Sequence, residues 1–398
     1  MTRLTTHAEA ARSAPPAQLP VPMLDFSRQY ALIRDEVLAA IERVCDSQQY
    51  ILGSAVIEFE RLAAEFLSVK ATVGCASGTD AIFLALAAAK VRPGDEVLTT
   101  PFSFFATASS ITRVGARPVF ADVDPVTLNL DPRQVERFVD GSHPRLKAIM
   151  PVHLYGLCAD MDEFLRLGKE ARLTVIEDAA QGFGAAWRGR RAGSIGDLAT
   201  FSFYPTKNLS AYGDAGCVTT NSEEFADRLR MLRNHGSRKR YYHEEIGWNS
   251  RLDSIQAAVL SVKLRYIEEW NRKRRERAAF YDRQFESSGL IQKGELGSVG
   301  IKLLHAPTEA YHICHQYVIR AARRDQLRRF LSERKIGSEV YYPVPLHLQE
   351  CFQYLGYTEG SLPESERAAR EALALPIYAE ITEEEQRVVV QAVADFYS

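Results

Sequence analysis

Seven short apolar segments that alternate with helical patterns constrain the fold of this chain more than any other feature of its sequence. They are rich in Val, Ile, Ala and Thr, and most are separated by stretches whose apolar residues recur at helical spacing. Apolar strands of this kind form a mostly parallel sheet covered by helices on both faces, and such sheets bind ligands beyond the carboxyl ends of their strands. The expected strands cover residues 71–75, 96–100, 117–121, 146–152, 173–178, 199–203 and 216–220.

The length of the chain predicts a second, smaller domain after this sheet. A chain of 398 residues has room for a large α/β domain and an additional one. A long helical pattern over 254–285 follows the last expected strand, and shorter strand-like and helical stretches continue to the C-terminus. We therefore expect a loose tail over residues 1–20, a large domain over 21–255, and a connecting helix with a smaller α/β domain over 256–398.

Charge and cysteine spacing argue against several classes of function. The 49 basic and 51 acidic side chains nearly balance, which gives no general attraction to nucleic acid or to an anionic membrane. The six cysteines are scattered and form no C-x-x-C pair, so we expect reduced thiols and neither a zinc site nor a disulfide framework. No apolar run is long enough to span a membrane. We expect a cytoplasmic protein without a metal, a nucleic-acid partner or a membrane anchor.

A carboxylate and a lysine follow two of the expected strands. Asp178 ends the apolar segment VIED, and Lys207 lies in the run FSFYPTKNL. In enzymes that use pyridoxal phosphate (PLP), a lysine holds the cofactor as a Schiff base, and a carboxylate keeps the pyridine nitrogen protonated so that the ring accepts electrons. Taken alone, the lysine would be a solvated surface group and the acid a helix cap. Their pairing predicts a PLP enzyme in which Lys207 and Asp178 are the catalytic residues.

Four further residues are candidates for binding the cofactor. Gly78 and Thr79 lie in ASGTDA, at the start of an expected helix whose free N–H groups and dipole attract phosphate, although the same residues favour an ordinary helix cap. Phe104, in PFSFFAT, would stack on a flat ring, although phenylalanines in such a cluster are more often core. Ser202 is expected to donate to the phosphate.

Together these segments resemble the DegT/DnrJ/EryC1/StrS family of nucleotide-sugar aminotransferases, which are PLP enzymes of the aspartate aminotransferase fold. The resemblance extends from about Pro22 to the C-terminus and rests on nine blocks in the order typical of the family. These blocks are ASGTDA (76–81), PFSFFAT (101–107), PVHLYG (151–156), EDAAQGFGA (177–185), FSFYPTKNL (201–209), GDAG (213–216), NHGS (234–237), GWNSRLDSIQAA (247–258) and YYPVPLHLQ (341–349).

The resemblance implies a fold and assigns roles to the cofactor-binding residues. The implied fold is a three-layer α/β/α PLP-transferase domain of fold type I with a smaller C-terminal α/β domain. Lys207 would hold the cofactor and move a proton during transamination, and Asp178 would pair with the pyridinium nitrogen. Phe104 would stack on the ring, and Gln181 would approach its phenolic oxygen. The residues that would hold the phosphate are Gly78, Thr79 and Ser202.

The resemblance also implies a partner and the substrates. Asn249 matches an asparagine that reaches the phosphate of the neighbouring subunit's cofactor, which implies a homodimer with shared sites. Arg251 is a candidate clamp for the carboxylate of L-glutamate, the usual amino donor, and equally a surface arginine. The remaining candidates for substrate binding are His153, His315 and Tyr317, with loop ordering as the alternative role for His153.

The reaction expected from the resemblance is ping-pong transamination, through pyridoxamine phosphate, of a keto group on a nucleotide-linked deoxysugar. The EDAAQ and YYPVPLHLQ blocks favour members that act at C3 of the sugar. The alternative is action at C4, although such members often have histidine where this chain has Gln181. Lys207 argues against a dehydratase of the same fold. Lys207 and Asp178 together argue against a catalytically silent regulatory or scaffold relative.

Overall fold

The computed structural model describes residues 19–398, so most of the tail expected over residues 1–20 lies outside the described residues. A seven-stranded sheet forms its centre, in the order β1-β9-β8-β5-β4-β2-β3. Only β9 runs against its neighbours, so the sheet is mostly parallel, as the sequence predicted. The strands are β1 (Ala71–Cys75), β2 (Glu96–Thr99), β3 (Arg117–Phe120), β4 (Leu146–Met150), β5 (Thr174–Asp178), β8 (Leu198–Ser202) and β9 (Gly216–Thr220).

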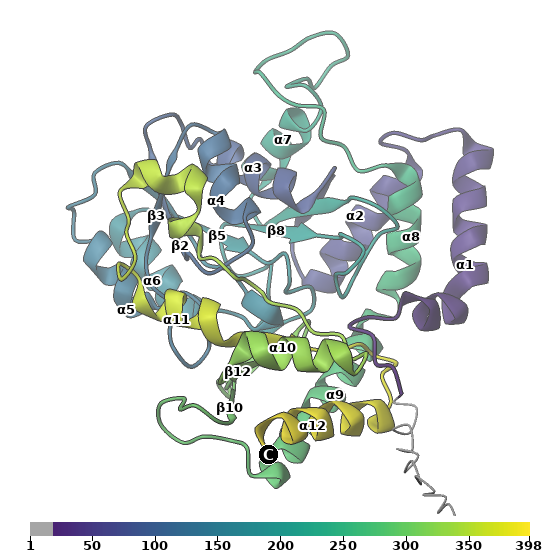
Figure 1. The fold of residues 1–398 in the computed structure, drawn as a ribbon. Helices are drawn as coiled ribbons and strands as arrows, with labels where there is room; N and C mark the ends of the chain where they lie inside the picture. Colours follow the sequence, from purple (N-terminus) through teal and green to yellow (C-terminus); the bar gives the residue numbers. More distant parts are fainter. Residues whose placement is uncertain (1–18) are drawn as a thin grey trace, which may run out of the picture.

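Helices cover both faces of this sheet and give it three layers (Figure 1). The strands are buried along almost their whole length, as in a parallel sheet with two covered faces. Apolar residues of α2, α6 and α8 pack on one face and those of α3, α4 and α7 on the opposite face, and together with the strands we call them the first core; α1 packs outside against α8. The helices are α1 (Phe26–Ser47), α2 (Ser54–Leu67), α3 (Gly78–Ala88), α4 (Ala106–Arg113), α5 (Pro132–Val135), α6 (Met161–Ala171), α7 (Glu223–Leu232) and α8 (Ser254–Leu264).

A second apolar core lies in the C-terminal part of the chain. It joins an antiparallel sheet of order β10-β12-β13 to three helices. Val21 is wholly buried in this core, and its backbone N–H donates to the carbonyl oxygen of Lys335 at 3.1 Å. The elements of this core are α9 (Ile267–Ser288), β10 (Ile301–Leu303), β12 (Tyr317–Ala321), α10 (Arg324–Glu333), β13 (Ala372–Leu375) and α12 (Glu383–Tyr397). Between α10 and β13 lies α11 (Pro363–Glu371), whose buried alanines belong to a different apolar cluster, and a further small sheet consists of β6 (Ala186–Trp187), β7 (Arg190–Arg191) and β11 (Ala310–Tyr311).

The helix expected over 254–285 is two helices, α8 and α9, which are interrupted at Arg265 and Tyr266. α8 packs in the first core, whereas α9 begins there with Ile267 and ends in the second core with Phe285. We propose that the two cores are the two expected domains, with α9 connecting them and the residues around Val21 added to the smaller one. Among residues 19–398, no helix combines the length and the apolar character needed to cross a bilayer.

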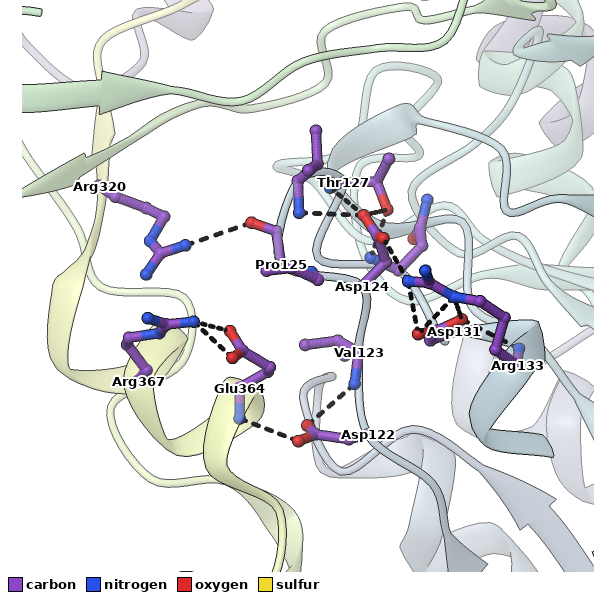
Figure 2. Close-up of polar contacts among 12 residues, drawn as sticks. Asp122, Val123, Asp124, Pro125, Thr127, Asp131, Arg133, Arg320, Glu364 and Arg367 are labelled. Carbon is purple, nitrogen blue, oxygen red and sulfur yellow. Dashed lines mark hydrogen bonds and ion pairs between the residues drawn. The ribbon is translucent and has the colours of Figure 1, made fainter. Parts of the chain in front are cut away.

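Polar contacts fix the loop after β3 to the C-terminal part of the chain (Figure 2). The Asp122 carboxylate accepts the backbone N–H groups of Glu364 at 2.9 Å and Ser365 at 2.8 Å, so it caps the start of α11. Arg320 of β12 donates to the carbonyl oxygen of Pro125 at 3.2 Å. These contacts set the position of the second core relative to the sheet.

Candidate active site

The carboxyl ends of five strands converge at one edge of the sheet. Because β1, β8, β5, β4 and β2 run in the same direction, the residues that follow them lie side by side. Asp178 is the last residue of β5, and Lys207 lies on the loop between β8 and β9. The fold therefore brings together two residues that the sequence separates by nearly thirty positions.

Asp178 and Lys207 interact electrostatically at the centre of this edge. Asp178 is buried, and burial raises the pKa of its carboxyl group, against the lowering effects of hydrogen bonds and of the nearby Lys207 charge. Lys207 is partly exposed, yet burial lowers the pKa of its amine to about 8, against the opposing effect of Asp178. A minority of this amine is therefore neutral, and nucleophilic, at pH 7, a far larger share than in an ordinary lysine.

A hydroxyl chain that sequence reasoning missed orients Asp178. Thr107 Oγ1 donates to Asp178 Oδ2 at 2.7 Å. The hydroxyls of Ser103 and Thr107 lie 2.8 Å apart, and because Thr107 gives its proton to Asp178, Ser103 is the donor in this pair. The backbone N–H of Ala180 donates to Asp178 Oδ1 at 3.2 Å. Both hydroxyls lie in the PFSFFAT block, but nothing in the sequence indicated that they face the carboxylate.

Gln181 and two aromatic residues form one wall of the site. Gln181 Oε1 accepts the backbone N–H of Tyr155 at 2.6 Å, and Gln181 Nε2 donates to the hydroxyl of Tyr342 at 3.1 Å. The ring of Phe104 is 57% exposed and its centroid lies 6.2 Å from that of Tyr342. Phe104 is therefore not a core residue. Burial and the nearby Asp178 charge raise the pKa of the Tyr342 hydroxyl, and the sequence identified the block of Tyr342 without singling out this residue.

The start of α3 approaches the end of β8 unusually closely. A Cβ atom added to Gly78 would lie 2.4 Å from Cβ of Ser202, so only glycine allows this contact. Ser77 caps the helix by accepting the backbone N–H of Asp80 at 3.1 Å, and the earlier N–H groups of α3 have no acceptor within the described part of the chain. The carbonyl oxygen of Thr79 accepts the hydroxyl of Ser110 at 3.2 Å. Free N–H groups beside Ser202 make this position suitable for an anionic group.

His153 lies beneath the site. It is wholly buried; its Nε2 lies 2.8 Å from Glu177 Oε2, and its Nδ1 accepts the backbone N–H of Ala159 at 3.2 Å. Glu177 also accepts three backbone N–H groups, from Gly193, Ile195 and Gly196. Both ring nitrogens of His153 are therefore occupied, which favours its loop-ordering role over substrate contact.

The other predicted substrate residues, and the predicted cofactor residue Asn249, lie in three different places. His315 is buried next to Lys207, whose charge, together with burial, holds the pKa of His315 well below its usual range. Tyr317 instead faces α9, where its hydroxyl donates to Asp282 Oδ1 at 2.7 Å. Asn249 is exposed, and both it and Arg251 line a separate hollow. Nε of Arg251 is buried there without a hydrogen-bond partner among the described residues.

A family model matches residues 31–394 of this chain, and its description is the DegT/DnrJ/EryC1/StrS aminotransferase family. The chain belongs to this family, and it is therefore an aminotransferase. The predicted family and enzyme class are confirmed.

Similar proteins span nearly the whole of this family member. A protein of Geobacillus stearothermophilus named "Pleiotropic regulatory protein" is 50% identical over 380 residues, which cover 95% of this chain and 98% of that protein. A dTDP-3-amino-3,4,6-trideoxy-alpha-D-glucose transaminase of Streptomyces venezuelae is 42% identical over 376 residues, covering 94% and 96%. The crystal structure of S. venezuelae DesV in complex with a ketimine intermediate is 41% identical, covers 95% of this chain and 99% of that chain, and superimposes with a TM-score of 0.90. The predicted fold is confirmed.

Members of this family are PLP-dependent, and the residues at the sheet edge fit that cofactor. The buried Asp178 carboxylate suits a protonated ring nitrogen, and the partly neutral Lys207 amine suits an aldehyde. The close contact of Gly78 with Ser202, beside the free N–H groups of α3, suits a phosphate. The exposed ring of Phe104 suits a flat heterocycle.

Proposed function

We propose that this protein uses PLP to transfer the amino group of L-glutamate to the keto group at C3 of a nucleotide-linked deoxysugar. The proposal is carried by the pairing of Lys207 with the buried carboxylate of Asp178 at the carboxyl edge of the sheet. The named Streptomyces venezuelae transaminase, whose sugar carries its amino group at position 3, supports the choice of C3.

The proposed roles of the site residues follow from their surroundings. When bound, the cofactor supplies an aldehyde for the amino group and a ring that accepts electrons. Lys207 would hold it and, once released, would take a proton at Nζ and return it, a task that an amine with a pKa of about 8 performs near neutral pH. Asp178 would keep the ring nitrogen protonated. Gly78, Thr79 and Ser202 would hold the phosphate.

We further propose that the enzyme works as a homodimer with shared sites. Asn249 is exposed in a hollow next to Ala76, close to the cradle at the start of α3, and its side chain has no hydrogen-bond partner among residues 19–398, which supports a contact with a second subunit. Arg251 is the proposed clamp for the glutamate carboxylate, because its buried Nε has no partner among residues 19–398. Among the predicted substrate residues, His315 is the one next to Lys207.

A regulatory function is the second candidate, because of the printed name of the Geobacillus protein. Nothing in the site favours it, since Lys207 and Asp178 are both present and interact electrostatically. We therefore expect any regulation to be a consequence of the enzyme's product.

The test is transamination of a panel of nucleotide sugars with a keto group at C3 or at C4, with glutamate as donor. Mass spectrometry should find the amino sugar from the 3-keto substrates, and Lys207→Ala should abolish the product. Preferential amination of the 4-keto substrates would overturn the C3 assignment. A protein that binds no PLP and aminates neither class would overturn the whole proposal.

Mixed dimers test the shared sites separately. Lys207→Ala and Asn249→Ala subunits should each be poorly active alone, and their mixture should recover activity because one of the two sites is then intact. If exchange of subunits is shown by mass and activity does not return, the site is not shared.

A further inference from the structure

A second lysine is buried close to the segment that carries Lys207. Lys263 lies on α8 and only 2% of it is exposed. Its Nζ donates to the hydroxyl of Ser210 at 2.7 Å, and the same Nζ lies 5.0 Å from the centroid of the Tyr212 ring. Ser210 and Tyr212 both belong to the short segment that directly follows Lys207. The interactions of Lys263 are thus directed to the loop of the reactive lysine.

A buried ammonium group at this position is costly. Burial lowers the pKa of Lys263 to about 8, and the acid that acts on it electrostatically is Glu380. An apolar residue of similar length would fill the same space without losing hydration, and buried charges seldom add to stability. The polar head of Lys263 therefore has a use other than stability.

The neighbouring contacts show what that use is. Residues 208–212 alternate: Leu209 and Ala211 are buried in the first core, and the other three residues are each hydrogen-bonded to α8 or α9. Asn208 Nδ2 donates to Asn271 Oδ1 at 3.1 Å, and the backbone N–H of Tyr212 donates to Gln256 Oε1 at 2.8 Å.

Together with the bond from Lys263 to Ser210, three alternate residues of the segment (208, 210 and 212) have a partner on α8 or α9. The partners occur in reverse order along the chain. The segment after Lys207 thus runs antiparallel to α8 and α9 and is fixed at three points, of which Lys263 is the central one. The first point, Asn208, is the residue next to Lys207. A displacement of this segment would move the Lys207 backbone relative to Asp178.

We propose that Lys263 is a positioning residue for the reaction: its buried amine, bound to Ser210, holds the segment that places Lys207 opposite Asp178. This role rests on the proposed function of Lys207. Its structural part can be tested in the protein without cofactor, so that failure of one idea is distinguishable from failure of the other.

The experiment compares Lys263→Met, Ser210→Ala and the double variant with the wild type, all free of PLP. Lys273→Met is the matched control, because Lys273 lies on α9 with 39% of its side chain exposed. One readout is amide hydrogen exchange of peptides covering residues 207–212. The other is the pH midpoint for acylation of Lys207, which mass spectrometry of the peptide assigns to that lysine.

In each single variant, we expect exchange over residues 207–212 to be about tenfold faster, the factor that the loss of one hydrogen bond to a charged group gives. The midpoint of Lys207 should rise by about one pH unit, because a looser loop admits water and weakens the effect of burial. The double variant should match the single ones, since both remove the same contact. Lys273→Met should behave as the wild type.

Wild-type exchange and a wild-type Lys207 midpoint in Ser210→Ala would overturn the proposal. Ser210→Ala removes one hydroxyl group, so it decides the question even if Lys263→Met does not fold. If the wild-type protein does not bind PLP, the proposed function is wrong. The exchange and acylation measurements would still test whether Lys263 holds the segment after Lys207.

Discussion

Replacement of Thr107 by valine tests whether the hydroxyl chain controls the charge of Asp178. Valine keeps the shape of threonine and removes the hydroxyl that donates to Asp178 Oδ2 at 2.7 Å. The side chains of Thr107 and Asp178 are both buried, and a hydrogen bond to a charged group contributes about 1.5–3 kcal/mol. Its loss should raise the pKa of Asp178 by about one to two units beyond the increase that burial already causes.

This shift makes the cost of the substitution depend on pH. Because the folded-state pKa of Asp178 lies above its ordinary value of 3.8, protonation of Asp178 stabilises the folded protein. This stabilisation is fully present below pH 3.8 and is lost as the pH rises through the folded-state pKa. The substitution raises the folded pKa further, so its full cost appears only where the carboxylate is charged. Thr107→Val should therefore lose about 1.5–3 kcal/mol more unfolding free energy at about pH 8 than at about pH 4.

Urea unfolding of the cofactor-free protein at the two pH values measures this difference. Thr112→Val is the control, because Thr112 lies on the same helix and its hydroxyl donates to its own helix, at the Ala108 carbonyl, at 3.3 Å. The Kd for PLP should also increase by about tenfold to a hundredfold. Equal losses of stability at both pH values would refute the idea that Thr107 acts through the charge of Asp178.

Three further substitutions test the cofactor link, the phosphate cradle and the junction between the cores. Borohydride should trap PLP on the peptide with Lys207, and Lys207→Ala should remain folded by circular dichroism; trapping on another lysine would contradict the assignment. Gly78→Ala should weaken PLP binding and cost about 1–3 kcal/mol in urea unfolding, because its Cβ would lie 2.4 Å from that of Ser202; Gly297→Ala, with open space around it, is the control. Asp122→Ala should cost about 1–3 kcal/mol in the same assay by removing the cap of α11, and no change would mean that the cap does not hold the junction.

The central sheet was predictable because its strands are apolar on both faces and are bounded by clear helix signals. The strands 71–75 and 216–220 begin and end where the sequence placed them. The smaller domain was harder to predict. β13 directly follows α11, so a helical pattern concealed a strand, and the residues near Val340 pair with β13 through a single bridge from Glu339 to Ala374. Short strands beside helices carry little periodic signal in the sequence, so pairing with other strands in the folded protein determines whether they form.

The site was predictable where chain order determines geometry and unpredictable where side-chain direction does. Asp178 and Lys207 follow strands whose carboxyl ends meet, so the fold alone brings them together. Tyr317 shows the limit, because alternation along β12 turns its hydroxyl toward Asp282 of α9. Thr107 shows the converse: it lies in the first turn of α4, and its hydroxyl, which the sequence did not single out, donates to the Asp178 carboxylate.

The two perturbed lysines show why a lowered pKa does not by itself identify a reactive amine. Burial lowers the pKa of both Lys207 and Lys263 to about 8. Lys263 is sealed from solvent and its amine is bound to Ser210, so it has little freedom to attack a substrate. Lys207 is partly exposed, has no hydrogen-bond partner for its amine among residues 19–398, and lies within the field of Asp178. Reactivity therefore follows from access and a free electron pair as well as from basicity, and the chain uses one buried lysine to hold the loop of another.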